Sequence, residues 1–373
     1  MGYIRPTRPT TTLIKHLSIP LLLLISGFCG ISYEVLYTKL LGNLLGNQFT
    51  INATVLLTFL GGIGFGTLFA HRFIRYLWLV EAGIGLYALL LTLLYPTLDQ
   101  LIYGLLPSLG TNILTSALVA FLVLAIPSFL VGCSLPLFAA YLGETRKQNI
   151  FSTTYSIYNV GAVITALVLE FWVLRAYGLI VTMQALAVLN FAVAGGLLML
   201  GRVSDLKPQL SPTRTQFAKP LLASLFVVSI ASAIFQLLGV KIFEFVFGPF
   251  NETFALVLAV VLFGIAVGSS AAGWLKLSYR NTLLMALAGL LLFLLLFEPV
   301  TTLYAALYPA AVDQYGLLVL LKLGIVFLLM FIPALGFGAT VPALLGQHQD
   351  VAKDSGSLFF TSPMGNVLAF ILM

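Results

Sequence analysis

The chain has 373 residues, of which 60% are hydrophobic and only 8% are charged, with a formal net charge of +6. A water-soluble domain of this length needs far more polar surface, so the composition excludes a soluble protein. The basic residues are spread over short segments between apolar runs, which excludes a nucleic-acid-binding face. The sequence therefore predicts a protein embedded in a lipid bilayer.

Apolar runs of about 20 residues, the length needed to cross a bilayer, recur along the whole chain. The expected fold is all-α, a polytopic transmembrane helical bundle. We expect spans at 17–36, 51–71, 76–95, 112–142, 151–174, 178–200, 220–240, 251–274, 282–298, 316–345 and, incompletely, 357–373. The short segments around Pro107 and Pro309 are expected to lie along the outer interface. No small-residue cleavage site follows the first run, so we interpret it as an uncleaved span.

A proline and glycine pattern, Pro-x4-Gly-x3-Pro, occurs twice in the chain. It falls in IPSFLVGCSLPLFAAYL (126–142) as Pro127, Gly132 and Pro136, and in IPALGFGATVPALL (332–345) as Pro333, Gly338 and Pro342. A proline inside a helix removes a backbone hydrogen bond and crowds the preceding turn, so we predict that both helices are kinked or broken there. Interrupted helices at matching positions point to a transport-type binding site, and kinked packing helices are the alternative.

The repeated pattern predicts a bundle of two parallel six-helix repeats, the second of them incomplete. The expected organisation is a cytoplasmic tail at 1–16, a first membrane repeat at 17–201, a cytoplasmic linker at 202–219 and a second repeat at 220–373. The second repeat is truncated in its fifth helix, so we expect the natural polypeptide to continue past Met373. Gly62 and Gly66 in the first repeat match Gly264 and Gly268, and this small-xxx-small spacing indicates close helix packing.

The placement of lysine and arginine indicates which side of the membrane each loop faces. A cytoplasmic N-terminus puts fourteen of the eighteen basic residues on the inner side. The four left on the outer side are Lys39, Arg175, Lys241 and Lys322. We therefore expect a multi-pass protein with its N-terminus in the cytoplasm.

Ionisable residues inside membrane spans are costly and are candidates for functional sites. The candidates are Glu34, Lys39, Glu81 and Glu170. Near the outer ends, sequence spacing pairs Glu34 with Lys39, Glu170 with Arg175 and Lys241 with Glu244, and salt-bridged interface pairs are the alternative to a functional role.

Glu81 differs from the other candidates because it lies about five residues into the third span. Its repeat counterpart, Met285, is uncharged, which indicates that the first repeat carries any proton or cation chemistry. An arginine partner, Arg72 or Arg75, would instead make Glu81 purely structural. The three histidines are far apart in the sequence, so we expect no metal site and no cofactor.

Five segments of the chain form a recognisable set: GFCGISYEVLYTKLLG (27–42), FLGGIGFGTLFAHR (59–72), LVEAGIGLYALL (79–90), GCSLPLFAAYL (132–142) and YSIYNVGAV (155–163). Together they resemble the transmembrane region of bacterial membrane-fused spermidine synthase-like proteins. The resemblance implies a duplicated, major-facilitator-like helical domain in the bacterial inner membrane, followed by a soluble aminopropyltransferase-type domain. No glycine-rich strand-to-helix loop of that enzyme type is found in the sequence, so no catalytic domain is expected within these 373 residues.

Two functions stay open on the sequence. One is a transporter-like domain that handles a small cationic solute, such as a polyamine given the resemblance. The other is a structural or accessory subunit that scaffolds a larger membrane complex or docks a soluble domain; a membrane enzyme acting alone is a third reading. The partners expected are the lipid bilayer and, in either case, a soluble domain or other membrane subunits, but no nucleic acid. A water-accessible cavity containing Glu34 or Glu81 between the two repeats favours transport, whereas apolar packing there favours the scaffold.

Overall fold

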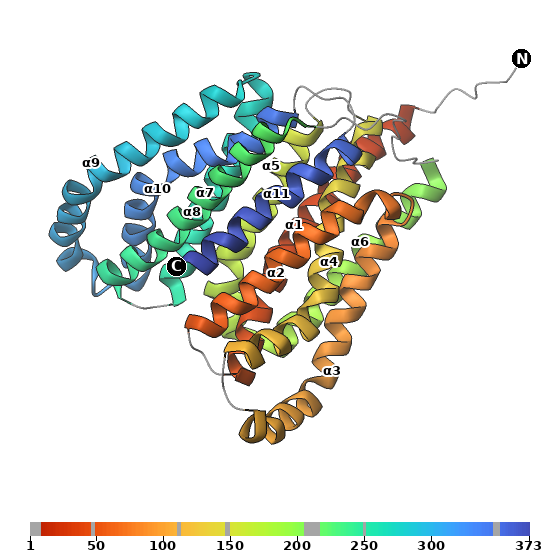
Figure 1. Cartoon of the computed structure of the whole chain (residues 1–373), viewed down its shortest axis with the longest axis horizontal. Helices are drawn as coiled ribbons and strands as arrows, with labels where there is room; N and C mark the ends of the chain where they lie inside the picture. The colour runs from red at the N-terminus through yellow and green to blue at the C-terminus, as the bar shows by residue number, and fades with distance from the viewer. Residues whose placement is uncertain are drawn as a thin grey trace, which may run out of the picture.

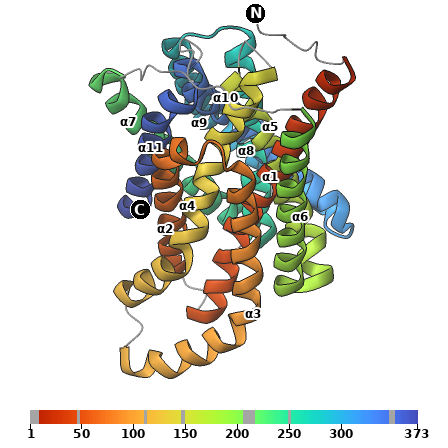
Figure 2. The same ribbon diagram turned by 90° about the vertical axis from the view of Figure 1, so that its right-hand side faces the viewer.

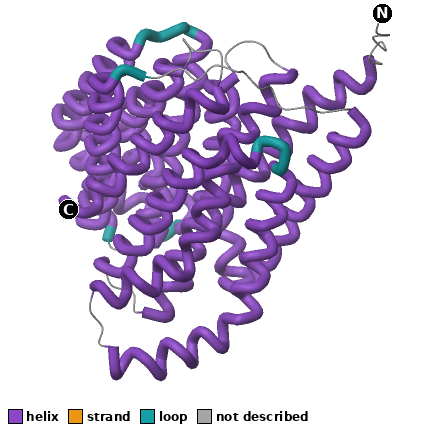
Figure 3. Tube along the Cα trace, turned by 45° about the vertical axis from the view of Figure 1, so that its right-hand side comes forward, coloured by secondary structure: helices purple, strands orange, loops and turns teal. Residues whose placement is uncertain are grey.

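The computed structural model describes residues 9–45, 49–109, 113–145, 150–204, 217–248, 251–345 and 351–373. Within these ranges the chain is helical apart from short turns, and no strand occurs (Figure 3). Eight helical segments in them are long and apolar enough to cross a membrane. The all-α, polytopic fold expected from the sequence is confirmed, and the protein is a multi-pass membrane protein.

The helices follow one another along the chain with short connections. The first group comprises α1 (Pro9–Leu45), α2 (Phe49–Phe69), the 3-10 turn η1 (Ala70–Phe73), α3 (Leu77–Leu109), α4 (Ile113–Thr145), α5 (Ile150–Val168), the π-helical turn η2 (Leu169–Val173) and α6 (Leu174–Ser204). The second group comprises α7 (Lys219–Phe247), α8 (Asn251–Trp274), α9 (Tyr279–Ala311), α10 (Tyr315–Leu345) and α11 (Val351–Leu372).

The same packing partners occur in the same order in the two groups. Helix α1 packs on α5 and α2 on α4, and correspondingly α7 packs on α11 and α8 on α10. The groups meet through α5 on α8 and α11 on α2. Figure 1 shows α7 to α10 on the left and α3, α4 and α6 on the right, with α5 and α11 between them. The order of these helix pairs is thus the same in the two groups, and their organisation as two repeats stays a prediction.

Glycines allow the backbones of paired helices to come close. A Cβ atom at Gly66 would overlap the backbone of Phe129 on α4, and one at Gly132 would overlap the backbone of Ile63 on α2. In lipid, helices associate through such close contacts because burying apolar surface gives no net gain over the lipid tails. The α2–α4 pair is therefore held together by small residues on both partners.

The equivalent glycines in the second group also allow two helix backbones to come close. Cβ atoms at Gly268 and Gly338 would overlap the backbones of Leu335 and Ile265 across the α8–α10 pair. The packing role predicted for the glycines of α2 and α8 is confirmed. Gly132 and Gly338, which the sequence assigned to helix interruption, serve the same close packing.

The prolines of the repeated pattern do not interrupt their helices. Helix α4 continues through Pro127 and Pro136, and α10 continues through Pro333 and Pro342. The turns on both sides of each proline are helical, so neither helix is broken. Whether the prolines kink the helices is not decided by this continuity, and the kink stays a prediction. Pro107 and Pro309 also lie in the last turns of α3 and α9 and not in separate short segments.

Helices α3 and α9 each have 33 residues, about 50 Å of helix, whereas the hydrocarbon core is about 30 Å thick. The last part of α3 turns away from the bundle, at the bottom of Figure 2. Pro96 lies inside α3 and Pro299 inside α9, and a proline in a helix interior is a usual cause of such a bend. The excess length of each helix thus extends beyond a single crossing.

A glycine kinks the chain within α6, one turn after the helix begins. Gly178 has a φ of 73° and a ψ of 177°, a conformation that other residues adopt only with strain. The preceding turn η2 is π-helical, which the sequence did not indicate. At the termini of the first group, α1 already begins at Pro9, within the expected tail, and the expected linker falls largely on residues 205–216, outside the described residues.

We predict that Gly132→Val and Gly338→Val each lower the stability of the protein, because the added side chain forces apart α2 and α4 or α8 and α10. Overpacking of this kind costs about 1–3 kcal/mol. Thermal unfolding in detergent measures the effect. Gly195→Val is the control, because a Cβ there has nothing within 4 Å. Equal unfolding temperatures for the control and for both test variants would contradict the packing role.

Candidate functional site

The side chain of Glu81, on the second turn of α3, is completely buried and surrounded by polar groups. The hydroxyls of Ser26 and Ser134 contact its Oε1 atom at 2.8 and 2.6 Å. The Asn190 amide donates from Nδ2 to Oε2 at 2.8 Å. Because each buried carboxyl oxygen has a hydrogen-bonding partner, the cost of removing this acid from water is partly offset.

Four helices bring these side chains together: α1 carries Ser26, α3 carries Glu81, α4 carries Ser134 and α6 carries Asn190. The packing of α1 and α3 against each other and against α4 and α6 brings these residues into contact. We call Ser26, Glu81, Ser134 and Asn190 the polar centre.

Tyrosines continue the polar centre along α1. Tyr33 donates its hydroxyl to Oδ1 of Asn190 at 3.0 Å, and its ring stacks on Tyr37 at 5.6 Å between centroids. The hydroxyl of Tyr37 is buried and has no hydrogen-bond partner among the described residues. Ser26, Tyr33 and Tyr37 are spaced by seven and four residues, so they lie on one face of α1.

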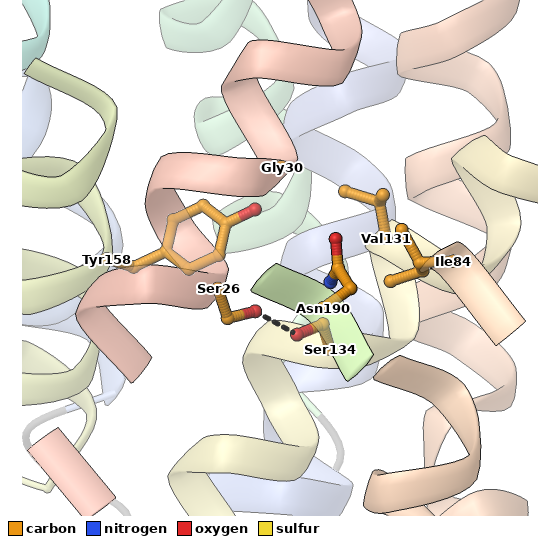
Figure 4. A pocket seen from close by; sticks show the side chains of 7 residues that line it. All are labelled: Ser26, Gly30, Ile84, Val131, Ser134, Tyr158 and Asn190. Carbon is orange, nitrogen blue, oxygen red and sulfur yellow. Dashed lines mark hydrogen bonds between the residues drawn. The ribbon is translucent and has the colours of Figure 1, made fainter. Parts of the chain in front are cut away.

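A small pocket adjoins the polar centre (Figure 4). It is lined by Ser26, Gly30, Ile84, Val131, Ser134, Tyr158 and Asn190. The space between atoms is about 160 Å³, but it is too narrow to hold a water molecule. Tyr158 on α5 closes it on one side, and its hydroxyl lies where a Cβ at Gly30 would be.

The pocket lies within the first group of helices and not between the two groups. The interface between the groups is instead filled by close contacts. On α5 and α8, Ser152 and Ser269 each donate a side-chain hydroxyl to the backbone carbonyl of the other. Across α2 and α11, the side chain of Met364 lies 3.2 Å from where a Cβ at Gly64 would be. Where the described residues of the two groups meet at these points, the space between them is occupied by side chains.

The sequence-predicted acids have different surroundings from those expected. Glu81 has neither of its two proposed arginine partners: the guanidinium of Arg72 lies over the Phe69 ring, 4.9 Å from its centroid. Glu34 is half-buried, and its carboxylate has no hydrogen bond or ion pair to any residue in the described part of the chain. The partner expected for Glu34, Lys39, binds Glu170 instead, at 3.1 Å.

The remaining outer-side charges form pairs that cross between helices. Arg175 lies 3.8 Å from Glu252 on α8 and does not pair with Glu170. Lys322 on α10 donates to the same Glu252 carboxylate at 2.9 Å, and so does the Tyr315 hydroxyl at 3.0 Å. Spacing along one helix predicts only the remaining pair correctly, Lys241 with Glu244 at 3.0 Å. All four basic residues assigned to the outer side therefore pair with carboxylates.

The described residues contain no group of three or more histidine, cysteine, aspartate or glutamate side chains that could hold a metal ion. Cys29 and Cys133 are both buried and free. The arrangement of the polar centre can bind a proton or a small cationic group, because its chemistry is that of one carboxyl group among neutral hydroxyls and an amide.

No protein-family model and no curated protein matches the sequence. Among solved structures, the POT family transporter PepTSo is similar over 98% of this chain and 90% of its own, with 14% identity and a TM-score of 0.47. An auto-inhibited POT family peptide transporter is similar over 95% of this chain and 88% of its own, with 16% identity and a TM-score of 0.44. Likenesses of this size carry no argument about solute or mechanism.

These comparisons correct the family suggested by the sequence. The resemblance to membrane-fused spermidine synthase-like proteins is wrong: neither a family model nor a curated protein supports it, and the solved structures above are peptide transporters. The five motifs are short and rich in glycine and apolar residues. Helix packing in a bilayer favours such residues in any bundle, so the motifs carry little information about family.

Sequence reasoning missed three members of the polar centre: Ser26, Ser134 and Asn190. One signal was present, because Asn190 is an amide inside a long apolar span, where polar side chains usually face another helix. The hydroxyl groups gave no comparable signal, since serine also bonds to its own helix backbone.

We predict that Glu252→Gln destabilises the protein by about 3 kcal/mol, because it removes the carboxylate that neutralises the buried Lys322. The side chains of this pair are 12% and 3% exposed. The matched control is Glu244→Gln, whose pair with Lys241 is 28% and 44% exposed and should contribute less than about 1 kcal/mol. Thermal unfolding in detergent compares the two, and a larger loss for Glu244→Gln would contradict the assignment.

Proposed function

We propose that this chain is a membrane transport-type domain whose polar centre at Glu81 binds a small solute with a positively charged group. The observation that carries the proposal is the complete burial of Glu81 among side chains from three other helices. An acid inside a membrane span is costly, and such residues mark solute and ion pathways more often than packing sites.

The chemistry of the polar centre favours a cation. Glu81 is the single ionisable carboxyl group in the cluster, and its partners Ser26, Ser134 and Asn190 are neutral. No ion pair to Glu81 is formed within the described ranges of the chain. An ionised Glu81 therefore lacks a counter-charge, which an ammonium or guanidinium group would supply. The hydroxyl and amide oxygens around it would accept the remaining N–H groups.

The counterparts of the polar centre in the second repeat support a single site. In the predicted repeat, Met285 stands opposite Glu81, whereas Thr340 stands opposite Ser134, so the second repeat keeps a hydroxyl group but has no carboxylate to pair with a cation. One repeat thus carries the chemistry, while the other supplies a matching helical frame. The repeat boundaries and the cytoplasmic N-terminus predicted from lysine and arginine placement are part of this proposal.

The closed pocket fits an occluded conformation in this scheme. A solute can reach Glu81 only if helices around the pocket separate, because the space present is too narrow even for water. The contacts between the two groups, α5 with α8 and α11 with α2, are the places where such a motion would begin. Tyr33 and Tyr37 line α1 beyond the centre and offer the solute polar and aromatic surface.

We predict that purified protein in liposomes takes up a small radiolabelled cation from a panel of ammonium analogues, methylammonium, guanidinium and choline. Uptake of that cation should fall at least tenfold in Glu81→Gln, because the neutral amide cannot pair with the cation. Glu244→Gln is the matched control and should retain uptake. Equal uptake by wild type and Glu81→Gln would contradict the role of Glu81.

A non-transporting scaffold is the second candidate, and the packed interface between the two groups favours it. The reciprocal hydroxyl-to-carbonyl contacts of Ser152 and Ser269 hold α5 against α8, and Ser270 donates to Ser156 at 2.8 Å beside them. A scaffold needs such rigidity and needs no opening. In this alternative the polar centre fixes the relative positions of α1, α3, α4 and α6.

A disulfide across the α5–α8 contact separates the two candidates. Ser152→Cys with Ser269→Cys, in a background with Cys29 and Cys133 replaced by alanine, is oxidised in liposomes. We expect oxidation to abolish uptake and reduction to restore it, because the two helices could no longer separate. The control pair, Ser32→Cys with Thr165→Cys, lies within the first group, where the native side chains are 3.3 Å apart. Full uptake by the oxidised test pair would contradict a role for α5–α8 separation in transport, and no uptake by either the oxidised or the reduced protein would favour the scaffold.

A further inference from the structure

Three oxygen atoms of the polar centre lie within hydrogen-bonding distance of one another. Ser134 Oγ is 2.6 Å and Ser26 Oγ is 2.8 Å from Oε1 of Glu81. The two serine oxygens are themselves 3.0 Å apart, as the dashed line in Figure 4 marks. The result is a closed triangle of mutual contacts, each as short as an ordinary O–H···O hydrogen bond.

A count of hydrogen atoms decides how the triangle is bonded. Three hydrogen bonds need three hydrogen atoms, and each serine hydroxyl supplies only one. An ionised carboxylate supplies none, so one side of the triangle would bring two oxygen atoms together with no proton between them. A protonated carboxyl supplies the third hydrogen atom and closes a ring. In that ring Glu81 donates to Ser134, Ser134 to Ser26, and Ser26 back to Glu81.

The other contacts of Glu81 agree with a neutral carboxyl group. Oε2 accepts a hydrogen bond from the Asn190 amide at 2.8 Å, which suits the carbonyl oxygen of a protonated acid. No basic side chain faces the carboxyl group within the described residues. The titratable groups packed around it are the Cys29 thiol and the Tyr33 hydroxyl on α1 and the Tyr158 hydroxyl on α5, and all of them are neutral acids at pH 7.

The geometry points to a proton-binding site: Glu81 is protonated in this closed conformation and exchanges that proton for one cationic group of a solute. The exchange rests on the function proposed above, whereas the protonation rests on the triangle alone. When the pocket opens, the O–H bond of the Glu81 carboxyl breaks and the proton passes to entering water. The carboxylate left behind pairs with the cation, so one positive charge replaces another.

Infrared difference spectroscopy of Glu81→Gln against the wild type tests the protonation directly. We expect the wild type to show the C=O stretch of a protonated carboxylic acid that the variant lacks. The matched control is Glu244→Gln, which should lose a carboxylate band instead, because Glu244 is paired with Lys241 at 3.0 Å. Loss of a carboxylate band in Glu81→Gln would overturn the inference.

The Glu81→Gln variant is expected to fold, since its amide can complete the same contacts. The side-chain nitrogen donates to both serine oxygens, one serine hydroxyl closes the third side, and the amide oxygen accepts from Asn190. If the variant does not fold, isotope-labelled glutamate in the wild type replaces the comparison. The carboxyl signal of a buried protonated glutamate that persists at pH 7 would support the inference, and its absence would overturn it.

A second measurement uses Cys29 as a reporter of opening, in a Cys133→Ala background. Cys29 is 1% exposed, so a thiol reagent modifies it only after the helices separate. The closed state binds one more proton than an open state with ionised Glu81, so the closed state loses population as the pH rises. Where this difference is one full proton, the opening equilibrium changes tenfold per pH unit.

The labelling rate of the wild type is divided by that of Glu81→Gln at each pH, which removes the pH dependence of the thiol itself. We expect the ratio to rise with pH, up to tenfold per unit. A ratio that does not change with pH would overturn the inference. Infrared evidence for the proton without any cation uptake would reject the transport proposal and leave the protonation intact, so the two failures are distinguishable.

Discussion

The close approach of α2 to α4, and of α8 to α10, is the constraint on which the rest of the bundle depends. Glycines at 66 and 132, and at 268 and 338, bring backbones so near that a single Cβ atom would overlap the facing chain. Inside a bilayer no hydrophobic gain drives helices together, so van der Waals contact at such points sets their separation. The position of α4 against α2 in turn decides where Ser134 meets α1 and α3.

The polar centre is a consequence of that packing. Glu81 would cost several kcal/mol in a lipid-facing position, and it is tolerated because α1, α4 and α6 each supply one polar side chain. In the repeat predicted from the sequence, Met285 occupies the position that matches Glu81, so the second group has no carboxylate there.

The basic residues predicted for the outer side form ion pairs. Lys39, Arg175, Lys241 and Lys322, which the predicted topology places on the outer side, each lie beside a carboxylate. Arg175 and Lys322 share Glu252, so one acid on α8 joins the first group of helices to α10. Of these four pairs, the Arg175–Glu252 pair joins the two groups, whereas the other three lie within one group.

The sequence by itself determined the fold class, because 60% hydrophobic residues and repeated runs of about 20 leave no alternative to a bundle of membrane helices. Glycine spacing also predicted correctly that Gly62, Gly66, Gly264 and Gly268 pack helices, and the charge and depth of Glu81 marked it as a candidate. Short-range spacing predicted the Lys241–Glu244 pair, since three residues on one helix are always neighbours.

Only the tertiary structure decided the partners. Lys39 meets Glu170 across 131 residues of chain, and Glu81 meets Asn190 across 109, separations that no local pattern encodes. The continuity of α4 and α10 through their prolines likewise depends on neighbouring helices, because packing holds the surrounding turns helical. Residue spacing predicts which side chains are neighbours on one helix, whereas the polar centre is formed by side chains from four different helices. For this physical reason its neutral members could not be predicted from the sequence.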